Sequence, residues 1–270
     1  MLMGDGFAKL LEGAAALAPL PLAAGPAPGQ IKNLVTFGDS YTDIDGHEDG
    51  GTVWPVFAAQ DGNFALFPFA KVGATYSNNL TFRPFPSLFE SQLPTYFSEK
   101  SNGSLAVLRP ENTIYTLWIG TNDVGANALL TGSQAPGVTL VDTATCAVNW
   151  VKTLYDSGAR NFIFQNMIPL ETTPLYAPDS YLNLYCDSQR NTTEWSVFMR
   201  EPTTAGNAIA RLELQFIAPT LHGAHIGLFD SHALLADMYA RPKLYLKRLG
   251  AVQRHRRGPR MRLPVRRKPA

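Results

Sequence analysis

The chain has 270 residues, of which 45% are hydrophobic and 17% charged, so it is long enough to bury the core of one α/β domain. No apolar run reaches the roughly 18 residues that a membrane-spanning helix needs, which argues against such a helix. The net charge of +1 hides an asymmetry: residues 1–246 hold 13 Lys and Arg and all 22 Asp and Glu, whereas residues 247–270 hold ten Lys and Arg and no acid.

The first 30 residues are rich in Ala, Leu and Pro. The stretch 14–24 resembles the hydrophobic region of a secretory signal peptide, although Asp5, Glu12 and the prolines depart from that pattern. We therefore expect a secreted protein, with a disordered leader as the alternative. Weak support for a secreted glycoprotein comes from three N-x-S/T sequons, which start at Asn79, Asn102 and Asn191.

The first expected strand covers residues 31–37 (IKNLVTF), an apolar and β-branched run that stops at Gly38-Asp39-Ser40. Residues 54–97 are dense in aromatics and prolines with no clear period, which predicts loops and short helices over a core. The run 113–120 is continuously apolar and predicts a central parallel strand that stops at Thr121-Asn122-Asp123.

A helix is expected over residues 139–159, because its apolar positions follow a helical period, Thr139 can cap its start and Gly158 lies near its end. Residues 161–170 predict a third strand, residues 203–217 a second helix and residues 225–230 a last strand. Strands that alternate with helices predict an α/β protein with a doubly wound parallel sheet.

Ser40, Gly73 and Asn122 are the candidate site residues. The carboxyl ends of parallel strands meet at one edge of a sheet, so Ser40 and Asn122 are expected there, beside amides that open a helix. A serine hydroxyl can attack an ester, while a main-chain amide at Gly73 and a carboxamide at Asn122 can stabilise the oxyanion. Taken singly, they are better explained as a helix cap, a loop glycine and a turn residue, and it is their joint order and placement at strand ends that favours a site.

These blocks resemble the GDSL, or SGNH, hydrolase superfamily. FGDSYTD at 37–43 matches the family's first block with Ser40 as nucleophile, KVGATYSNN its second with Gly73, and GTND its third with Asn122. Over roughly residues 30–246 the chain is similar to fungal secreted acetylesterases of the carbohydrate esterase family 16 type.

The resemblance implies a three-layer α/β/α, flavodoxin-like fold that needs no cofactor and no metal. It also implies an oxyanion site made by Ser40, Gly73 and Asn122, and removal of small acyl groups, chiefly acetyl, from plant-wall sugars. We expect a monomer whose partner is a small ester or an acetylated carbohydrate, with no nucleic-acid or membrane partner.

The chain departs from that family in its catalytic base. Family members carry an Asp and a His three positions apart near the C-terminus, the His taking the serine proton. No histidine here follows an Asp at that spacing; the five are His47, His222, His225, His232 and His255. By position His232, two residues after Asp230, is the best surviving candidate base, although a capping role is ordinary there.

We accordingly divide the chain into a leader or signal-like segment (1–30), an SGNH hydrolase domain (31–246) and a basic, disordered tail (247–270). We interpret this tail as an out-of-frame or mis-spliced continuation, so that the family's C-terminal part is truncated or replaced. We expect a serine ester hydrolase with absent or weak activity. The alternative is a non-catalytic carbohydrate-binding protein, with Trp54 and Phe57 stacking on sugar rather than packing in the core.

Overall fold

The computed structural model describes residues 25–46, 51–183 and 186–246. Most of the expected leader and the whole basic tail lie outside the described residues, so both stay predictions. Within the described ranges, no helix is long and apolar enough to cross a membrane.

A five-stranded parallel sheet forms the centre of the molecule, with strand order β2-β1-β3-β4-β5. The strands are β1 (Asn33–Gly38), β2 (Ala65–Pro68), β3 (Thr113–Trp118), β4 (Asn161–Gln165) and β5 (His225–Phe229). At the carboxyl edge Gly38 lies opposite Trp118, Trp118 opposite Gln165, and Gln165 opposite Phe229. The expected α/β fold with a parallel sheet is confirmed.

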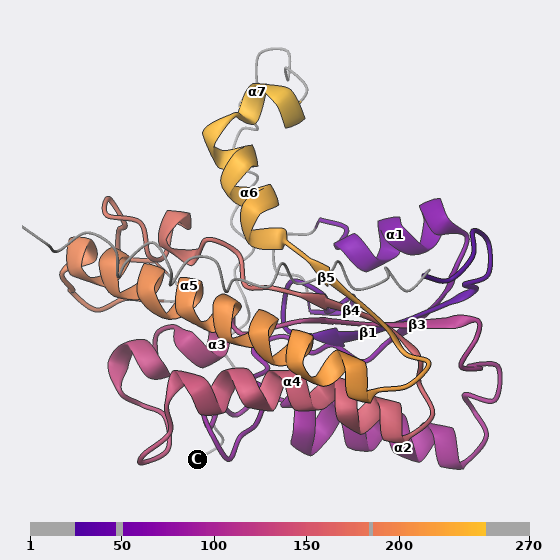
Figure 1. Cartoon of the computed structure of the whole chain (residues 1–270). Coiled ribbons are helices and arrows are strands. Elements are labelled where there is room, and N and C mark those ends of the chain that lie inside the picture. Colours follow the sequence, from indigo (N-terminus) through magenta and orange to yellow (C-terminus); the bar gives the residue numbers. More distant parts are fainter. Residues whose placement is uncertain (1–24, 47–50, 184–185, 247–270) are drawn as a thin grey trace, which may run out of the picture.

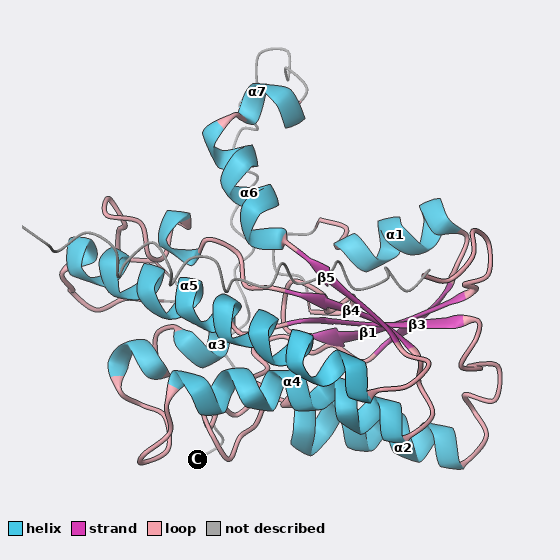
Figure 2. Cartoon of the chain, viewed as in Figure 1, coloured by secondary structure: helices cyan, strands magenta, loops and turns pink. Residues whose placement is uncertain are grey.

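Helices lie on both sides of this sheet (Figures 1 and 2). On one side are α2, α4 and α5, and on the other are α1 and α6 (Figure 1). The helices are α1 (Trp54–Gly62), α2 (Leu93–Ser101), α3 (Thr121–Val124), α4 (Leu140–Asp156), α5 (Thr192–Ile217), α6 (Ser231–Ala240) and α7 (Pro242–Tyr245). A π-helical turn at Leu88–Gln92 leads into α2.

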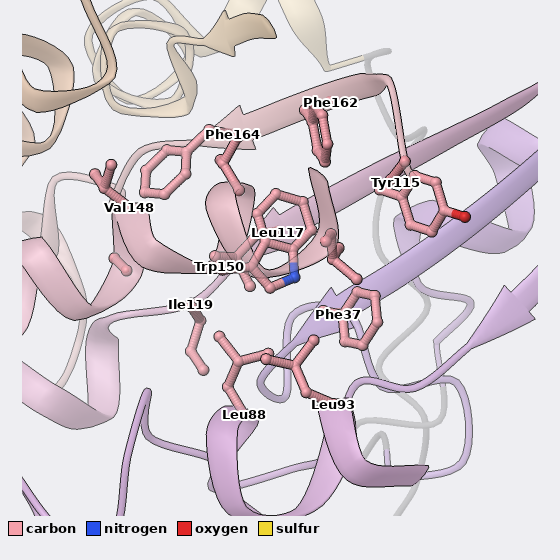
Figure 3. Close-up of a cluster of buried hydrophobic side chains, with 14 of the residues drawn as sticks. Phe37, Leu88, Leu93, Tyr115, Leu117, Ile119, Val148, Trp150, Phe162 and Phe164 are labelled. Carbon is pink, nitrogen blue, oxygen red and sulfur yellow. The ribbon is translucent and has the colours of Figure 1, made fainter. Parts of the chain in front are cut away.

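The main core fills the space between the sheet and the layer of α2 and α4 (Figure 3). Trp150 of α4 is fully buried and packs edge-on against Phe37 of β1 and Phe162 of β4, each with ring centroids 5.9 Å apart. The start of α4 is fixed by a capping box between Thr139 and Asp142, as the sequence predicted for Thr139.

Three elements differ from the sequence-based expectation. The strand β2 was missed, because a four-residue edge strand that ends in a proline carries no alternating pattern. β4 stops at Gln165 rather than at residue 170. α5 starts at Thr192, whereas the prediction placed its start at residue 203. The start was misplaced because a proline normally interrupts a helical pattern, and Pro202 lies inside this helix.

The last strand and the helices that follow it expose much apolar surface. α6 and α7 project away from the sheet (Figure 1). Leu228 and Phe229 of β5 are 39% and 44% exposed, and Leu244 of α7 is 69% exposed. By contrast, every residue of β1 is buried.

Candidate active site

Ser40 stands in a tight turn directly after β1. The amides of Thr42 and Asp43 both donate to the carbonyl oxygen of Asp39 at 3.0 Å, which closes the turn. Ser40 is exposed, whereas Asp39 is fully buried. Among the described residues no helix begins before Trp54, so a turn rather than the expected helix start supplies the amides beside the serine.

The end of β1 is held by a buried glutamine that the sequence analysis did not single out. The Gly38 amide donates to Gln92 Oε1 at 3.1 Å, and Gln92 Nε2 donates back to the Gly38 carbonyl at 2.8 Å. The Lys71 amide donates to the same carbonyl at 3.2 Å. These contacts fix the backbone from which the Ser40 turn departs.

Gly73 lies in the loop after β2. Its neighbour Val72 is hydrogen-bonded to the Ser40 turn, and its neighbour Ala74 is hydrogen-bonded to Asn122. The Val72 amide donates to Asp43 Oδ2 at 2.7 Å, and Asn122 Nδ2 donates to the Ala74 carbonyl at 2.9 Å. Gly73 has a φ of 73°, and a Cβ added there would lie 2.5 Å from Cγ of Phe85. Only glycine fits this backbone without displacing that ring.

Asn122 belongs to the short helix α3, which follows β3. Its side chain is part-buried and makes two hydrogen bonds, donating from Nδ2 to Ala74 and accepting at Oδ1 from Arg83 Nη1 at 2.9 Å. Ser40, Gly73 and Asn122 thus follow the neighbouring strands β1, β2 and β3, at the carboxyl edge of the sheet.

Two buried carboxyl groups lie behind these residues. Burial raises the pKa of Asp39 to about 7, an effect that the Tyr41 amide and the Arg83 charge oppose. Burial and the nearby Asp39 also raise the pKa of Asp123 well above its usual range. Asp39 Oδ1 accepts from the Tyr41 amide at 3.1 Å and Asp123 Oδ1 from the Tyr76 amide at 2.9 Å. Neither Oδ2 has a hydrogen-bond partner among the described residues.

His232 lies elsewhere on the same edge of the sheet, in the first turn of α6. Its amide donates to Asn166 Oδ1 at 2.9 Å, and its Nε2 is buried without a partner among the described residues. β5 is separated from β1 by β3 and β4, so three strand spacings of about 4.8 Å, roughly 14 Å, lie between their ends. No hydrogen bond joins His232 to Ser40, and its role as a base stays a prediction.

The other two described histidines give no base at Ser40. His225 lies at the amino end of β5, at the opposite edge of the sheet, with Nδ1 2.9 Å from Asn161 Oδ1, and His222 is exposed just before it. His47 and His255 lie outside the described residues. The described residues contain no group of three or more His, Cys, Asp or Glu that could hold a metal ion.

The two rings considered for sugar stacking have different surroundings. Trp54 is half-buried, donates from Nε1 to Thr42 Oγ1 at 3.2 Å and packs edge-on against Trp118. Phe57 on α1 is 53% exposed.

The chain has two cysteines, Cys146 and Cys186, and both are free thiols.

Fold and site together define a class: an α/β protein with an exposed serine at the carboxyl edge of a parallel sheet, beside a loop glycine and an asparagine. Residues 34–212 match the family model described as GDSL-like Lipase/Acylhydrolase, and the chain belongs to that family. The resemblance predicted from FGDSYTD, Gly73 and GTND is therefore confirmed.

Two curated relatives are acetylesterases. One, from Hypocrea jecorina, is 28% identical over 256 residues, which cover 80% of this chain and 74% of the relative. The other, from Thermothelomyces thermophilus, is 27% identical over 170 residues, or 53% of this chain and 55% of the relative.

Similar solved structures include an α/β hydrolase from the metagenome of Lake Arreo, Spain, with 14% identity and a TM-score of 0.43 over 82% of this chain and 84% of that one. A catalytic mutant of an acetylxylan esterase from Geobacillus stearothermophilus has 13% identity and a TM-score of 0.45, over 80% and 82% of the two chains.

Proposed function

We propose that this chain is a serine ester hydrolase that takes small acyl esters, chiefly acetyl groups on carbohydrate, and that its own turnover is absent or very slow. The observation that supports the ester-binding part is the convergence of Ser40, Gly73 and Asn122 at the ends of three neighbouring strands. The absence of a hydrogen-bonded base at Ser40 in the described part of the chain supports the second part.

The proposed reaction is acyl transfer through the serine. Ser40 Oγ attacks the ester carbonyl carbon while its proton passes to a base, and the carbonyl oxygen becomes an oxyanion. The amides of Ser40 and Gly73 and the Nδ2 group of Asn122 are the proposed donors to that oxygen. Collapse of the intermediate releases the sugar alcohol, and attack of water on the acyl-serine releases the carboxylic acid and restores the hydroxyl.

The surroundings of Gly73 favour a small acyl group. The Phe85 ring lies so close to Gly73 that even one added methyl group would meet it, and we take this ring as one wall of the acyl site. Acetyl is the smallest common acyl group after formyl. The acetylesterases among the relatives support the same substrate class.

Slow turnover follows from the lack of a proton acceptor at Ser40 among the described residues. A serine hydroxyl is a weak nucleophile unless a neighbouring base takes its proton, and loss of the base of a comparable triad costs about 10⁶ in turnover, near 8 kcal/mol. His232 is the best remaining histidine by position, but the strand order separates it from Ser40 by two intervening strands.

Chemical rescue tests both parts of the proposal. The full chain is incubated with acetylated xylo-oligosaccharides at rising imidazole concentrations, and acetate release is compared with that of Ser40→Ala. We expect the two proteins to match without imidazole, because the base is missing. With imidazole, a saturable rate that depends on Ser40 is expected, because the free base replaces the missing one.

The possible results separate the two parts. A Ser40-dependent rate without imidazole would refute slow turnover and reveal a base within the chain. Equal rates for both proteins at every imidazole concentration would refute the ester-hydrolase machinery itself. Phe85→Ala is a useful companion, since we expect it to widen the accepted acyl group from acetyl towards butyryl.

A further inference from the structure

Arg83 is the only side chain in the described residues that donates a hydrogen bond to the carboxamide oxygen of Asn122. We infer that Arg83 is a positioning residue that fixes and polarises the Asn122 carboxamide, so that one of its N–H bonds is presented to the acyl oxygen. The catalytic consequence rests on the proposed function, whereas the orientation of the amide does not.

The two contacts of Asn122 define which way its amide faces. Oδ1 accepts from Arg83 Nη1 at 2.9 Å, and Nδ2 donates to the Ala74 carbonyl at 2.9 Å. Exchanging the oxygen and nitrogen would place two donors together at Arg83 and two acceptors together at Ala74. The network therefore admits one orientation, in which the second Nδ2 hydrogen has no partner among the described residues.

The surroundings of Arg83 keep its guanidinium in this place. Its charge lies near the buried carboxyl groups of Asp39 and Asp123, with which it interacts electrostatically. Its guanidinium carbon is 5.6 Å from the centre of the Phe85 ring, and its amide donates to Asn78 Oδ1 at 3.2 Å. No ion pair within 4.0 Å involves Arg83 among the described residues. Its hydrogen-bonding capacity is therefore directed at the neutral amide.

A cation that donates to an amide oxygen makes the amide nitrogen a stronger donor. Hydrogen bonds with one charged partner are roughly twice as strong as neutral ones, and they withdraw electron density from the carboxamide. Removing one oxyanion donor lowers turnover by about 10² to 10³ in a comparable site. Loss of Arg83 leaves the Asn122 donor in place but free to turn, so a smaller loss, about tenfold to a hundredfold, is expected.

NMR of the full chain tests the orientation independently of any activity. Asparagine is labelled with ¹⁵N, and the Asn122 side-chain signals are identified by their absence in Asn122→Ala. In Arg83→Met we expect these protons to exchange with water at least about fivefold faster. We also expect their chemical shifts to move towards those of the side-chain amide of the exposed Asn127. Arg83→Lys, which keeps a cationic donor, should retain most of the protection.

Melting temperatures separate positioning from a general structural role. Faster exchange in Arg83→Met at an unchanged melting temperature, with protection retained in Arg83→Lys, supports the proposal. Unchanged Asn122 signals in Arg83→Met overturn it, and so does faster exchange that accompanies a clear fall in melting temperature.

The imidazole-rescued reaction then tests the catalytic consequence. In Arg83→Met the Ser40-dependent kcat should fall about tenfold to a hundredfold with a KM change below about threefold. If no Ser40-dependent rate exists at all, the proposed function fails while the NMR result still decides the role of Arg83. An unchanged kcat in Arg83→Met, together with a changed Asn122 signal, would refute the catalytic consequence and leave Arg83 with the orientation of the amide alone.

Discussion

At the scale of single residues, Asp39 and Ser40 are chain neighbours with opposite environments. The turn after β1 directs the Asp39 carboxyl into the core and leaves Ser40 exposed. The carboxyl receives one main-chain hydrogen bond at Oδ1 and none at Oδ2 from the described residues, which is too little to solvate a charge. A neutral acid is therefore favoured beside Ser40, the proposed nucleophile.

This environment predicts a pH dependence of stability. Burial raises the pKa of Asp39 from 3.8 to about 7, so the folded state prefers the protonated acid. The associated stabilisation is fully present below about pH 3.8 and is lost as the pH rises through about 7. Between about pH 5 and pH 8, Asp39 should lower the free energy of unfolding by roughly 2 to 3 kcal/mol.

Urea unfolding of Asp39→Asn across this range checks the prediction. Asparagine resembles the neutral acid, so the variant should lose distinctly less stability than the wild type between those two pH values. Asp61→Asn, a change at an exposed residue of α1, serves as the control and should follow the wild type. Parallel pH curves for Asp39→Asn and the wild type would contradict a buried, protonated Asp39.

At the scale of elements, the end of β1 depends on the helical turn before α2. Gln92, at the end of the π-helical turn, is 2% exposed and pairs with both the amide and the carbonyl of Gly38. Gly38 itself cannot be replaced easily, since a Cβ there would lie 2.3 Å from the Trp118 carbonyl oxygen. The turn that carries Ser40 is thus supported by β3 and by a segment more than 50 residues away.

Replacing Gln92 with leucine should destabilise the protein by roughly 1 to 3 kcal/mol, because the buried Gly38 amide loses its acceptor while the volume is kept. Urea unfolding measures this loss, with Gln60→Leu on the exposed side of α1 as the matched control. A Gln92→Leu variant as stable as that control would show that the two hydrogen bonds between Gln92 and Gly38 do not contribute to stability.

Local sequence signals predicted the elements and site positions that depend on chain neighbours. Ser40 and Asn122 follow runs of apolar, β-branched residues, so their place at strand ends could be inferred before the structure was known. Gly73 was found through the family motif, since its loop follows β2, a strand too short to show a pattern.

The supporting residues could not be predicted in the same way. Arg83 meets Asn122 across 39 positions of the chain, and Gln92 meets Gly38 across 54. Such contacts depend on how the loops cross the sheet edge, which periodicity and turn signals do not encode. The start of α5 was misplaced for a local reason, because Pro202 is tolerated inside a helix whose packing outweighs one lost hydrogen bond.

At the scale of the whole molecule, the inner strand β1 and the edge strand β5 differ in how well they are covered. β1 is wholly buried, whereas β5, α6 and α7 expose large apolar side chains that include Leu228, Leu234 and Leu244. Exposed apolar surface of this kind binds hydrophobic dyes and promotes association.

The native protein should therefore enhance the fluorescence of a dye such as anilinonaphthalene sulfonate before any unfolding. The double variant Leu234→Gln, Leu244→Gln should reduce that signal with little change in melting temperature, since the two residues are 38% and 69% exposed. Val107→Gln, at an exposed position remote from α6, should leave the dye signal unchanged. A native protein that binds no dye would contradict the exposed surface.

The placement of the ester-binding groups has a consequence for how such a protein can change. Within the described residues, the hydrogen bonds that arrange the neighbours of Ser40, Gly73 and Asn122 are made by residues between 38 and 122, whereas the candidate base His232 follows β5. Under the proposed function, the groups that bind the ester and the group that would take the proton therefore belong to separate stretches of the chain. A mutation beyond β5 would then remove turnover without altering the groups proposed to bind the acyl oxygen, and a designed histidine would restore it.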